Sequence, residues 1–203
     1  MKRKPKLGQN FLVDDAARHA IVDAVGDIGK RTVIEIGPGH GAITEILAGR
    51  CRRLIALELD RALAAELTFR FRDQPQVQII EADVLKVDLR ALVPNGETAD
   101  VIGNLPYYIT SDILLQLFAA GSAGLITRTV LMMQREVADR VAAAPGVRDY
   151  GLLGNRADER TGRQPFHAAT LGVLAASGRL LHCAAVAVCT TVCRARRRCC
   201  RLQ

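Results

Sequence analysis

The sequence has no run of apolar residues that approaches the roughly 18 needed to span a membrane. It has no CxxC pair, and its four His are scattered, so the usual spacings of a metal site are missing. No apolar segment follows the basic start Met1–Lys6, which argues against a secretory signal peptide. These absences predict a cytoplasmic chain that binds neither a membrane nor a metal ion, and we expect a monomer.

Lysine is absent from the last fifty residues, 154–203, which hold nine Arg and only two acids. The formal net charge of +7 lies entirely in this segment, because residues 1–153 hold 19 cations and 19 anions. Five of the six Cys are there as well. We interpret the break as the boundary between an α/β domain, residues 1–153 with a short basic N-terminal arm, and an Arg-, Ala- and Cys-rich tail, residues 154–203, that is not a native domain.

Short β-branched runs alternate with helical patterns throughout the first 153 residues. We expect strands at residues 32–36, 54–58, 77–80, 99–103 and 129–133. We expect helices at residues 15–25, 42–48, 61–72, 112–120 and 135–144, the fourth capped by Thr110 or Ser111. This alternation predicts a doubly wound, mostly parallel sheet that binds its ligands at the carboxyl edge of the strands.

Three features at that edge fit a cofactor that contains adenosine. The loop Gly37–Gly41 directly follows the first strand, and glycines there let the backbone approach a ligand closely. Glu58 ends the second strand and can accept both hydroxyls of a ribose, while Asp83, after the third strand, can accept from an exocyclic amine. Gly37, Gly39 and Ala42 also match the looser dinucleotide fingerprint, so these features leave a nicotinamide dinucleotide open beside S-adenosylmethionine.

The fourth strand ends in the turn Asn104-Leu105-Pro106-Tyr107, because proline cannot donate to a strand ladder. By itself this is a strand-ending turn with a half-buried tyrosine. The Asn104 side-chain oxygen and the Leu105 carbonyl can, however, accept from an NH₂ group, and Tyr107 offers a stacking face for a base. Such a grip exposes the nitrogen lone pair to a sulfonium methyl group. The turn therefore favours methyl transfer from S-adenosylmethionine over hydride transfer, which would need an acid–base residue.

The motifs that carry a family resemblance are, in chain order, Leu7–Leu12, Glu35–Gly41, Glu58, Asp83 and Asn104–Tyr108. In this order and spacing they resemble the small-subunit ribosomal RNA adenine dimethyltransferases, with the erythromycin-resistance methyltransferases as close relatives. The resemblance covers roughly residues 4–153. It implies a Rossmann-like methyltransferase fold and transfer of two methyl groups to N6 of each of two neighbouring adenosines near the 3′ end of small-subunit rRNA. The substrate would be the immature small ribosomal subunit, and the process ribosome biogenesis.

The resemblance also assigns residues to ligands. It implies that S-adenosylmethionine is bound by Asn10, Leu12, Gly37, Glu58, Asp83 and Asn104, with Gly39 in the same glycine loop. It implies that the target adenine is held by the four residues Asn104, Leu105, Pro106 and Tyr107.

The resemblance stops near residue 153, before the closing β-hairpin and the small helical domain that the family has. We interpret residues 154–203 as the frame-shifted translation of a GC-rich gene; the alternative is a genuine basic RNA-binding tail. The apolar stretch Leu180–Cys193 is too short for a membrane anchor. An open sheet edge would invite aggregation, so we expect weak or absent cofactor binding and little dimethylation by this chain. The alternative function is a non-catalytic rRNA-binding assembly factor.

Overall fold

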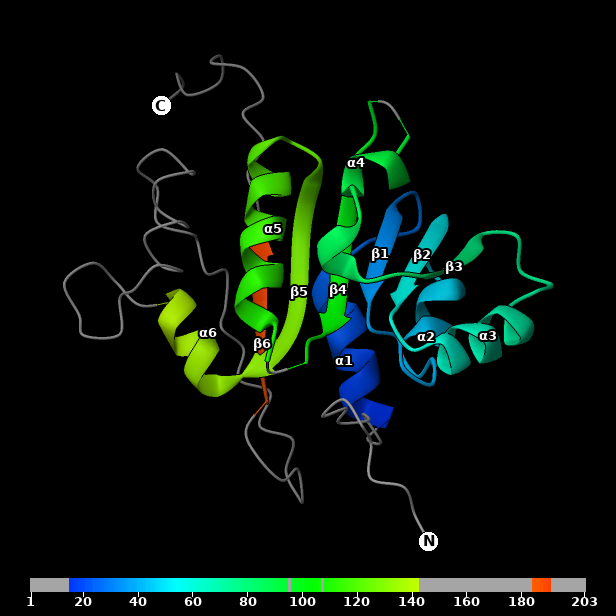
Figure 1. Ribbon diagram of the computed structural model, residues 1–203, viewed down its shortest axis with the longest axis horizontal. Helices are drawn as coiled ribbons and strands as arrows, with labels where there is room; N and C mark the ends of the chain where they lie inside the picture. The colour runs from blue at the N-terminus through cyan, green and yellow to red at the C-terminus, as the bar shows by residue number, and fades with distance from the viewer. Residues whose placement is uncertain (1–14, 95, 107, 143–183, 191–203) are drawn as a thin grey trace, which may run out of the picture.

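The computed structural model describes residues 15–94, 96–106, 108–142 and 184–190. Within these ranges a six-stranded sheet runs in the order β3-β2-β1-β4-β5-β6 (Figure 1). The strands are β1 (Thr32–Ile36), β2 (Arg53–Glu58), β3 (Val77–Glu81), β4 (Ala99–Asn104), β5 (Ile126–Gln134) and β6 (Ala184–Thr190). The helices are α1 (Asp15–Val25), α2 (Thr44–Ala48), α3 (Arg61–Arg70), α4 (Leu89–Leu92), α5 (Thr110–Ser122) and α6 (Arg135–Ala142), with a 3₁₀ turn at Val84–Lys86.

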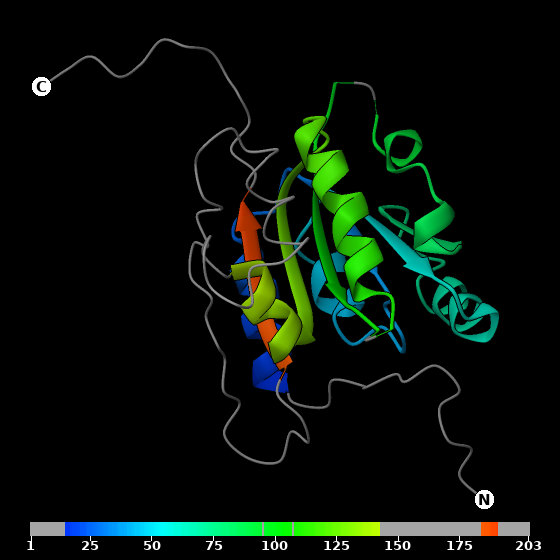
Figure 2. The same ribbon diagram turned by 60° about the vertical axis from the view of Figure 1, so that its left-hand side comes forward.

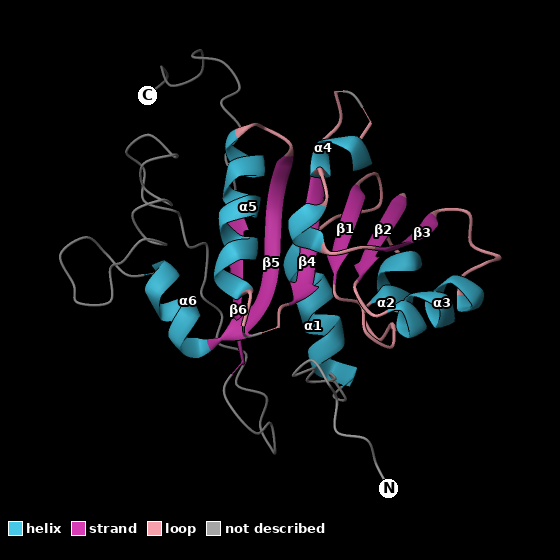
Figure 3. Ribbon diagram, in the orientation of Figure 1, coloured by secondary structure: helices cyan, strands magenta, loops and turns pink. Residues whose placement is uncertain are grey.

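The sheet is covered by helices on both faces, as Figures 2 and 3 show. Successive strand residues point to opposite faces, so one apolar strand feeds two cores. Val33 of β1 belongs to the core cluster that contains residues of α1, α2 and α3, whereas its neighbour Ile34 belongs to the cluster that contains residues of α5. Strands β1 to β5 pair in parallel. The doubly wound, mostly parallel sheet predicted from the alternation is therefore confirmed.

Most expected elements are present, with differences at their ends. The second helix begins at Thr44 rather than at residue 42, because residues 39–43 form turns in which Gly39 and Gly41 have positive φ. The expected cap of α5 is wrong: Thr110 lies inside the first turn, and its hydroxyl donates to the Pro106 carbonyl at 2.9 Å. The short turns at Val84–Lys86 and Leu89–Leu92 were not predicted, since neither is long enough to show a period.

Strand β6 corrects the expectation of an open edge at β5. It pairs antiparallel with β5 from Arg128↔Thr190 to Gln134↔Ala184. Its sequence alternates Ala with Val and ends in Cys and Thr, a composition suited to a strand. The other residues of the predicted tail lie outside the described ranges. None of the helices in the described part of the chain combines the length and hydropathy needed to cross a membrane.

Candidate functional site

The carboxyl ends of β1, β2 and β4 bring three of the sequence-predicted features to one edge of the sheet. Ile36, the last residue of β1, is in register with Leu57 of β2 and Gly103 of β4. The residues that follow these three positions are Gly37, Glu58 and Asn104. A Cβ atom placed on Gly37 would lie 3.5 Å from the Asn104 carbonyl oxygen. The glycine loop and the Asn-Leu-Pro turn, more than sixty residues apart in sequence, are therefore adjacent in the fold.

The loop after β1 needs glycine because its backbone is left-handed. Gly37 has φ 67° and Gly41 has φ 80°, a region that favours residues without a Cβ. The Gly37 amide donates to the Leu57 carbonyl at 3.0 Å, and the Gly41 amide donates to the Pro38 carbonyl at 2.9 Å. A Cβ on Gly41 would come within 2.7 Å of the Leu67 side chain. The loop is thus held in one shape by backbone bonds to β2 and within itself.

The Glu58 carboxylate joins the glycine loop to the start of α3. It is 3% exposed, and its Oε2 accepts from the Gly39 amide at 3.0 Å. Its Oε1 accepts from the Asp60 amide at 2.9 Å. A carboxylate has about four lone-pair sites, so roughly two remain for a ligand after these bonds. The sequence predicted that Glu58 accepts from ribose hydroxyls. The structure shows that it also holds the loop Gly37–Gly41 through the Gly39 amide.

Asp83 starts the 3₁₀ turn that follows β3. Its Oδ1 accepts from the Leu85 amide at 3.1 Å, and its Oδ2 lies 3.6 Å from Lys86 Nζ. The Ala82 amide donates to the Glu58 carbonyl at 2.9 Å, which ties this turn to the end of β2. The side chain is 27% exposed. Asp83 is therefore a helix-capping residue beside Glu58, and its role toward an amine stays a prediction.

The Asn-Leu-Pro turn is held from both sides. The Leu105 amide donates to the Met132 carbonyl at 3.0 Å, and the Leu105 side chain is 2% exposed in the core. The Pro106 carbonyl accepts from the Ile109 amide at 3.3 Å as well as from the Thr110 hydroxyl. Only the backbone of Leu105 can thus serve the site. Three predicted site residues lie outside the described ranges: Asn10, Leu12 and Tyr107.

Glu35 is a buried acid at this edge that sequence reasoning did not select. It is 2% exposed, and its Oε2 has no hydrogen-bond partner among the described residues; the same holds for the hydroxyl of Thr44. Burial raises the pKa of Glu35 from 4.5 to about 8, and the nearby charge of Glu58 adds to this effect. The sequence held a weak signal for Glu35, because it is a charged residue inside the otherwise largely apolar strand Thr32–Ile36.

Gly103 was also missed, although a glycine inside an apolar strand indicates a close backbone approach. A Cβ on Gly103 would lie 2.8 Å from the Ile36 carbonyl oxygen and 3.1 Å from Ile36 Cβ. Contacts this short would force β1 and β4 apart. Because Ile36 and Gly103 directly precede Gly37 and Asn104, the absence of a side chain at Gly103 lets the two halves of the site meet.

The protonation of Glu35 predicts a pH dependence of stability. The folded chain keeps a proton on Glu35 that the unfolded chain loses above its ordinary pKa of 4.5. The free energy of unfolding therefore falls as the pH rises from about 4.5 to about 8, by up to roughly 1.4 kcal/mol per pH unit. We expect Glu35→Gln to flatten this slope in urea titrations between about pH 5.5 and about pH 7.5.

The matched control for Glu35→Gln is Glu66→Gln, which makes the same chemical change on an acid whose side chain is 53% exposed. Its slope should equal that of the parent chain. Equal slopes for all three proteins would contradict the assignment of a buried, protonated Glu35.

The described ranges contain no group of three or more His, Cys, Asp or Glu side chains placed to hold a metal ion. The chemistry of the edge rests on backbone amides, carboxylates and one carboxamide. This donor set suits an organic ligand with hydroxyl and amine groups.

Comparison with known proteins identifies the family. The family model described as "Ribosomal RNA adenine dimethylase" matches residues 1–157. The chain belongs to this family.

The curated protein "Ribosomal RNA small subunit methyltransferase A" of Acidobacterium capsulatum is 63% identical over 152 residues, which are 75% of this chain and 53% of that protein. The protein of the same name from Koribacter versatilis is 55% identical over 163 residues, 74% of this chain and 56% of that protein. The chain thus spans about half the length of the curated relatives it matches.

Two solved structures agree with the fold. The 23S rRNA methyltransferase ErmE is 29% identical and superposes with a TM-score of 0.57, covering 66% of this chain and 51% of that one. A dimethyladenosine transferase from Plasmodium falciparum has a TM-score of 0.68 at 19% identity and covers 89% of this chain and 63% of that one. The second likeness, at its low identity, shows the shared methyltransferase fold alone.

Proposed function

We propose that this chain is an rRNA adenine-N6,N6-dimethyltransferase that uses S-adenosylmethionine to methylate two adjacent adenosines near the 3′ end of small-subunit rRNA. One observation carries the proposal: Gly37 lies against the Asn104 carbonyl, so a cofactor loop and an amine-binding turn share one sheet edge. Family membership and relatives named ribosomal RNA small subunit methyltransferase A support the substrate class.

The residues present fit the cofactor. The left-handed turn through Gly37 and Gly39 keeps the backbone free of Cβ atoms where a ligand would approach. Glu58 keeps about two lone-pair sites for ribose hydroxyls after accepting two amides. Asp83, beside the backbone bond from Ala82 to Glu58, is the acceptor for the adenine amine. We assign Asn10 and Leu12 to the same ligand from the family resemblance.

When bound, S-adenosylmethionine supplies an electrophilic methyl group on a sulfonium sulfur. The side-chain oxygen of Asn104 and the carbonyl of Leu105 accept from the N6 amine of the target adenine and orient its lone pair toward that methyl. The bound cofactor would supply this methyl group and would leave as a thioether that keeps the electron pair of the S–C bond, while the adenine nitrogen would form the new N–C bond. The methylated nitrogen then releases a proton to solvent. Pro106 fixes the turn, and Tyr107 stacks on the adenine.

A titration with S-adenosylmethionine followed by calorimetry tests the cofactor. The sequence led us to expect weak or absent binding because of an open edge at β5, but β6 covers that edge. We now expect the parent chain to bind S-adenosylmethionine. Glu58→Gln should weaken this binding by about tenfold or more, because the variant lacks the carboxylate charge that strengthens hydrogen bonds from the ribose hydroxyls. Glu97→Gln, at the opposite end of the sheet, should bind like the parent. No heat of binding with the parent chain would contradict the proposal.

The partner and setting are part of the same proposal. We propose that the chain acts on the immature small ribosomal subunit, because its relatives are named for the RNA of that subunit. We propose as well that it acts as a monomer in the cytoplasm. We propose that residues 154–203 are not a native domain. The pairing of β6 with β5 argues against this proposal, because it places part of this segment in the sheet. Resequencing the gene decides: an intact reading frame that no one-base shift converts into the family's hairpin would exclude a frameshift.

A further inference from the structure

We infer that the groove between α3 and β3 binds single-stranded RNA, as a second contact beside the catalytic edge. The inference deepens the proposed function, because it presupposes that the partner is RNA. The groove has a volume of about 590 Å³ and lies on the outer flank of the sheet, where β3 is the edge strand. It is lined by Arg61, Ala64, Ala65, Thr68, Phe69, Arg72, Ile79 and Glu81.

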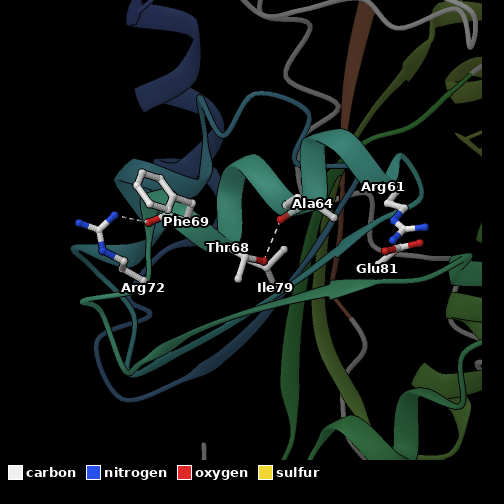
Figure 4. A pocket seen from close by; sticks show the side chains of 8 residues that line it. Arg61, Ala64, Thr68, Phe69, Arg72, Ile79 and Glu81 are labelled. Atoms are coloured by element: carbon white, nitrogen blue, oxygen red, sulfur yellow. Dashed lines mark hydrogen bonds between the residues drawn. The ribbon is translucent and has the colours of Figure 1, made fainter.

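Figure 4 shows how the lining is arranged along the groove. Phe69 and Arg72 lie at one end, Arg61 and Glu81 lie at the other, and Ala64, Thr68 and Ile79 lie between them. The Thr68 hydroxyl donates to the Ala64 carbonyl at 2.8 Å, so the middle of the groove is apolar in character. An apolar stretch between two cations suits a base with a phosphate on each side.

An exposed aromatic ring is the feature of the groove that points to a base. Phe69 is 70% exposed, although burying a phenylalanine would stabilise the fold by about 1.5–3 kcal/mol. The Arg72 guanidinium carbon lies 4.3 Å from the ring centroid, and Arg72 Nη1 donates to the Phe69 carbonyl at 3.2 Å. The ring is therefore held in place by its cation while most of its surface stays open for stacking.

The charges fit a phosphate backbone that runs along α3. Arg61 is the first residue of α3, which is roughly 15 Å long at about 1.5 Å per residue, and Arg72 lies in the turn after the helix ends at Arg70. Arg61 directly follows Asp60, whose amide is bound by Glu58 of the cofactor edge. One end of the groove therefore begins next to the candidate active site. Each cation has an acid nearby: Glu81 lies at the Arg61 end, and Asp73 Oδ2 lies 3.5 Å from Arg72 Nε. A phosphate at either arginine therefore competes with that carboxylate.

Fluorescence anisotropy with a labelled oligoadenylate of about twelve nucleotides tests the inference on the full 203-residue chain. We expect Phe69→Leu to weaken binding about fivefold or more, because leucine keeps apolar volume but cannot stack, and Phe69→Tyr to restore it. We expect Arg61→Gln and Arg72→Gln each to lower the slope of log affinity against log salt by about 0.7, the value for one lost phosphate contact on a single strand.

The matched control is Arg90→Gln, an exposed arginine on α4, which lies away from α3 and β3 in Figure 1. It should leave both affinity and salt slope as in the parent. Equal affinities and slopes for the groove variants and Arg90→Gln would overturn the inference, as would no binding of the oligonucleotide by the parent. The failure of this inference and the failure of the proposed function are distinguishable. If the parent chain does not bind S-adenosylmethionine but the groove variants still lose RNA binding, the groove is supported and the proposed enzyme is not.

Discussion

Replacing Asp100 by Ala is expected to lower the free energy of unfolding by about 3 kcal/mol. Asp100 is fully buried at the amino end of β4, and it accepts from two arginines. Arg31 donates through Nε and Nη2 at 3.0 Å each. Arg128 donates through Nη2 at 3.0 Å and Nε at 3.4 Å. The single carboxylate is thus the common acceptor for two guanidinium groups that arrive from before β1 and from β5.

The size of the effect follows from what the variant leaves behind. Truncation removes the anion but keeps two cations that have lost its charge and its hydrogen bonds, a change that typically costs about 3–5 kcal/mol in a buried network. The Arg31 and Arg128 side chains are 28% and 26% exposed, so water compensates in part. We therefore expect the lower end of that range. Urea titration followed by circular dichroism measures it.

Glu97→Ala is the matched control for Asp100→Ala at the same end of the sheet. Glu97 also accepts from an arginine, Arg52, and that hydrogen bond holds the pKa of the Glu97 carboxyl below its usual range. Its pair is open to solvent, however, so its removal should destabilise the chain much less than removal of Asp100. Equal destabilisation by the two substitutions would contradict the view that burial makes Asp100 decisive.

Replacing Asn104 by Ala is expected to lower methyl transfer at least about 100-fold, the loss typical of removing one aligned polar contact from an active site. Asn104 ends β4 opposite Met132, and its backbone carbonyl faces Gly37, so the position is fixed by two neighbouring strands. The substitution removes the side chain that we propose accepts from the target amine and that the family resemblance also assigns to S-adenosylmethionine. Incorporation of labelled methyl groups into immature small subunits, with the chain in excess, measures the rate of a single turnover.

Thr98→Ala provides the control, because it truncates a polar side chain next to the other end of β4. RNA binding by both variants should equal that of the parent. This comparison separates the enzyme from a non-catalytic assembly factor: only the enzyme predicts that Asn104→Ala loses function while RNA stays bound. Full turnover by Asn104→Ala would refute the assigned role. The low dimethylation expected from the sequence stays a prediction, measured by the parent chain in the same assay.

Local signals explain why much of the candidate site was predictable. The β-branched run Thr32–Ile36, the glycines after it and the proline at 106 each restrict the backbone within a few residues. Parallel strands place their carboxyl ends at one edge, so the alternation of strands and helices predicted that the glycine loop, Glu58 and Asn104 would share that edge. The structure confirms this edge in the register of Ile36 with Leu57 and Gly103. The binding roles themselves stay predictions.

One error arose where a distant segment decides the outcome. Nothing in the local pattern indicated that residues 184–190 would pair with β5, because their partners are at least fifty residues away. The other error, the cap of α5, is local. Thr110 is of a residue type common at helix caps, but its hydroxyl donates to the Pro106 carbonyl four residues earlier and it lies inside the first turn.

By itself, the sequence determined the alternation of strands and helices, the left-handed glycine loop and the Asn-Leu-Pro turn, because each depends on the conformational limits of nearby residues. Only the tertiary structure decided which charges matter. It brought Arg31 and Arg128 to Asp100 across 69 and 28 residues, and it left Glu35 buried with an unpaired oxygen. Burial and ion pairing depend on what packs around a side chain, and that environment is assembled from segments that are far apart along the chain.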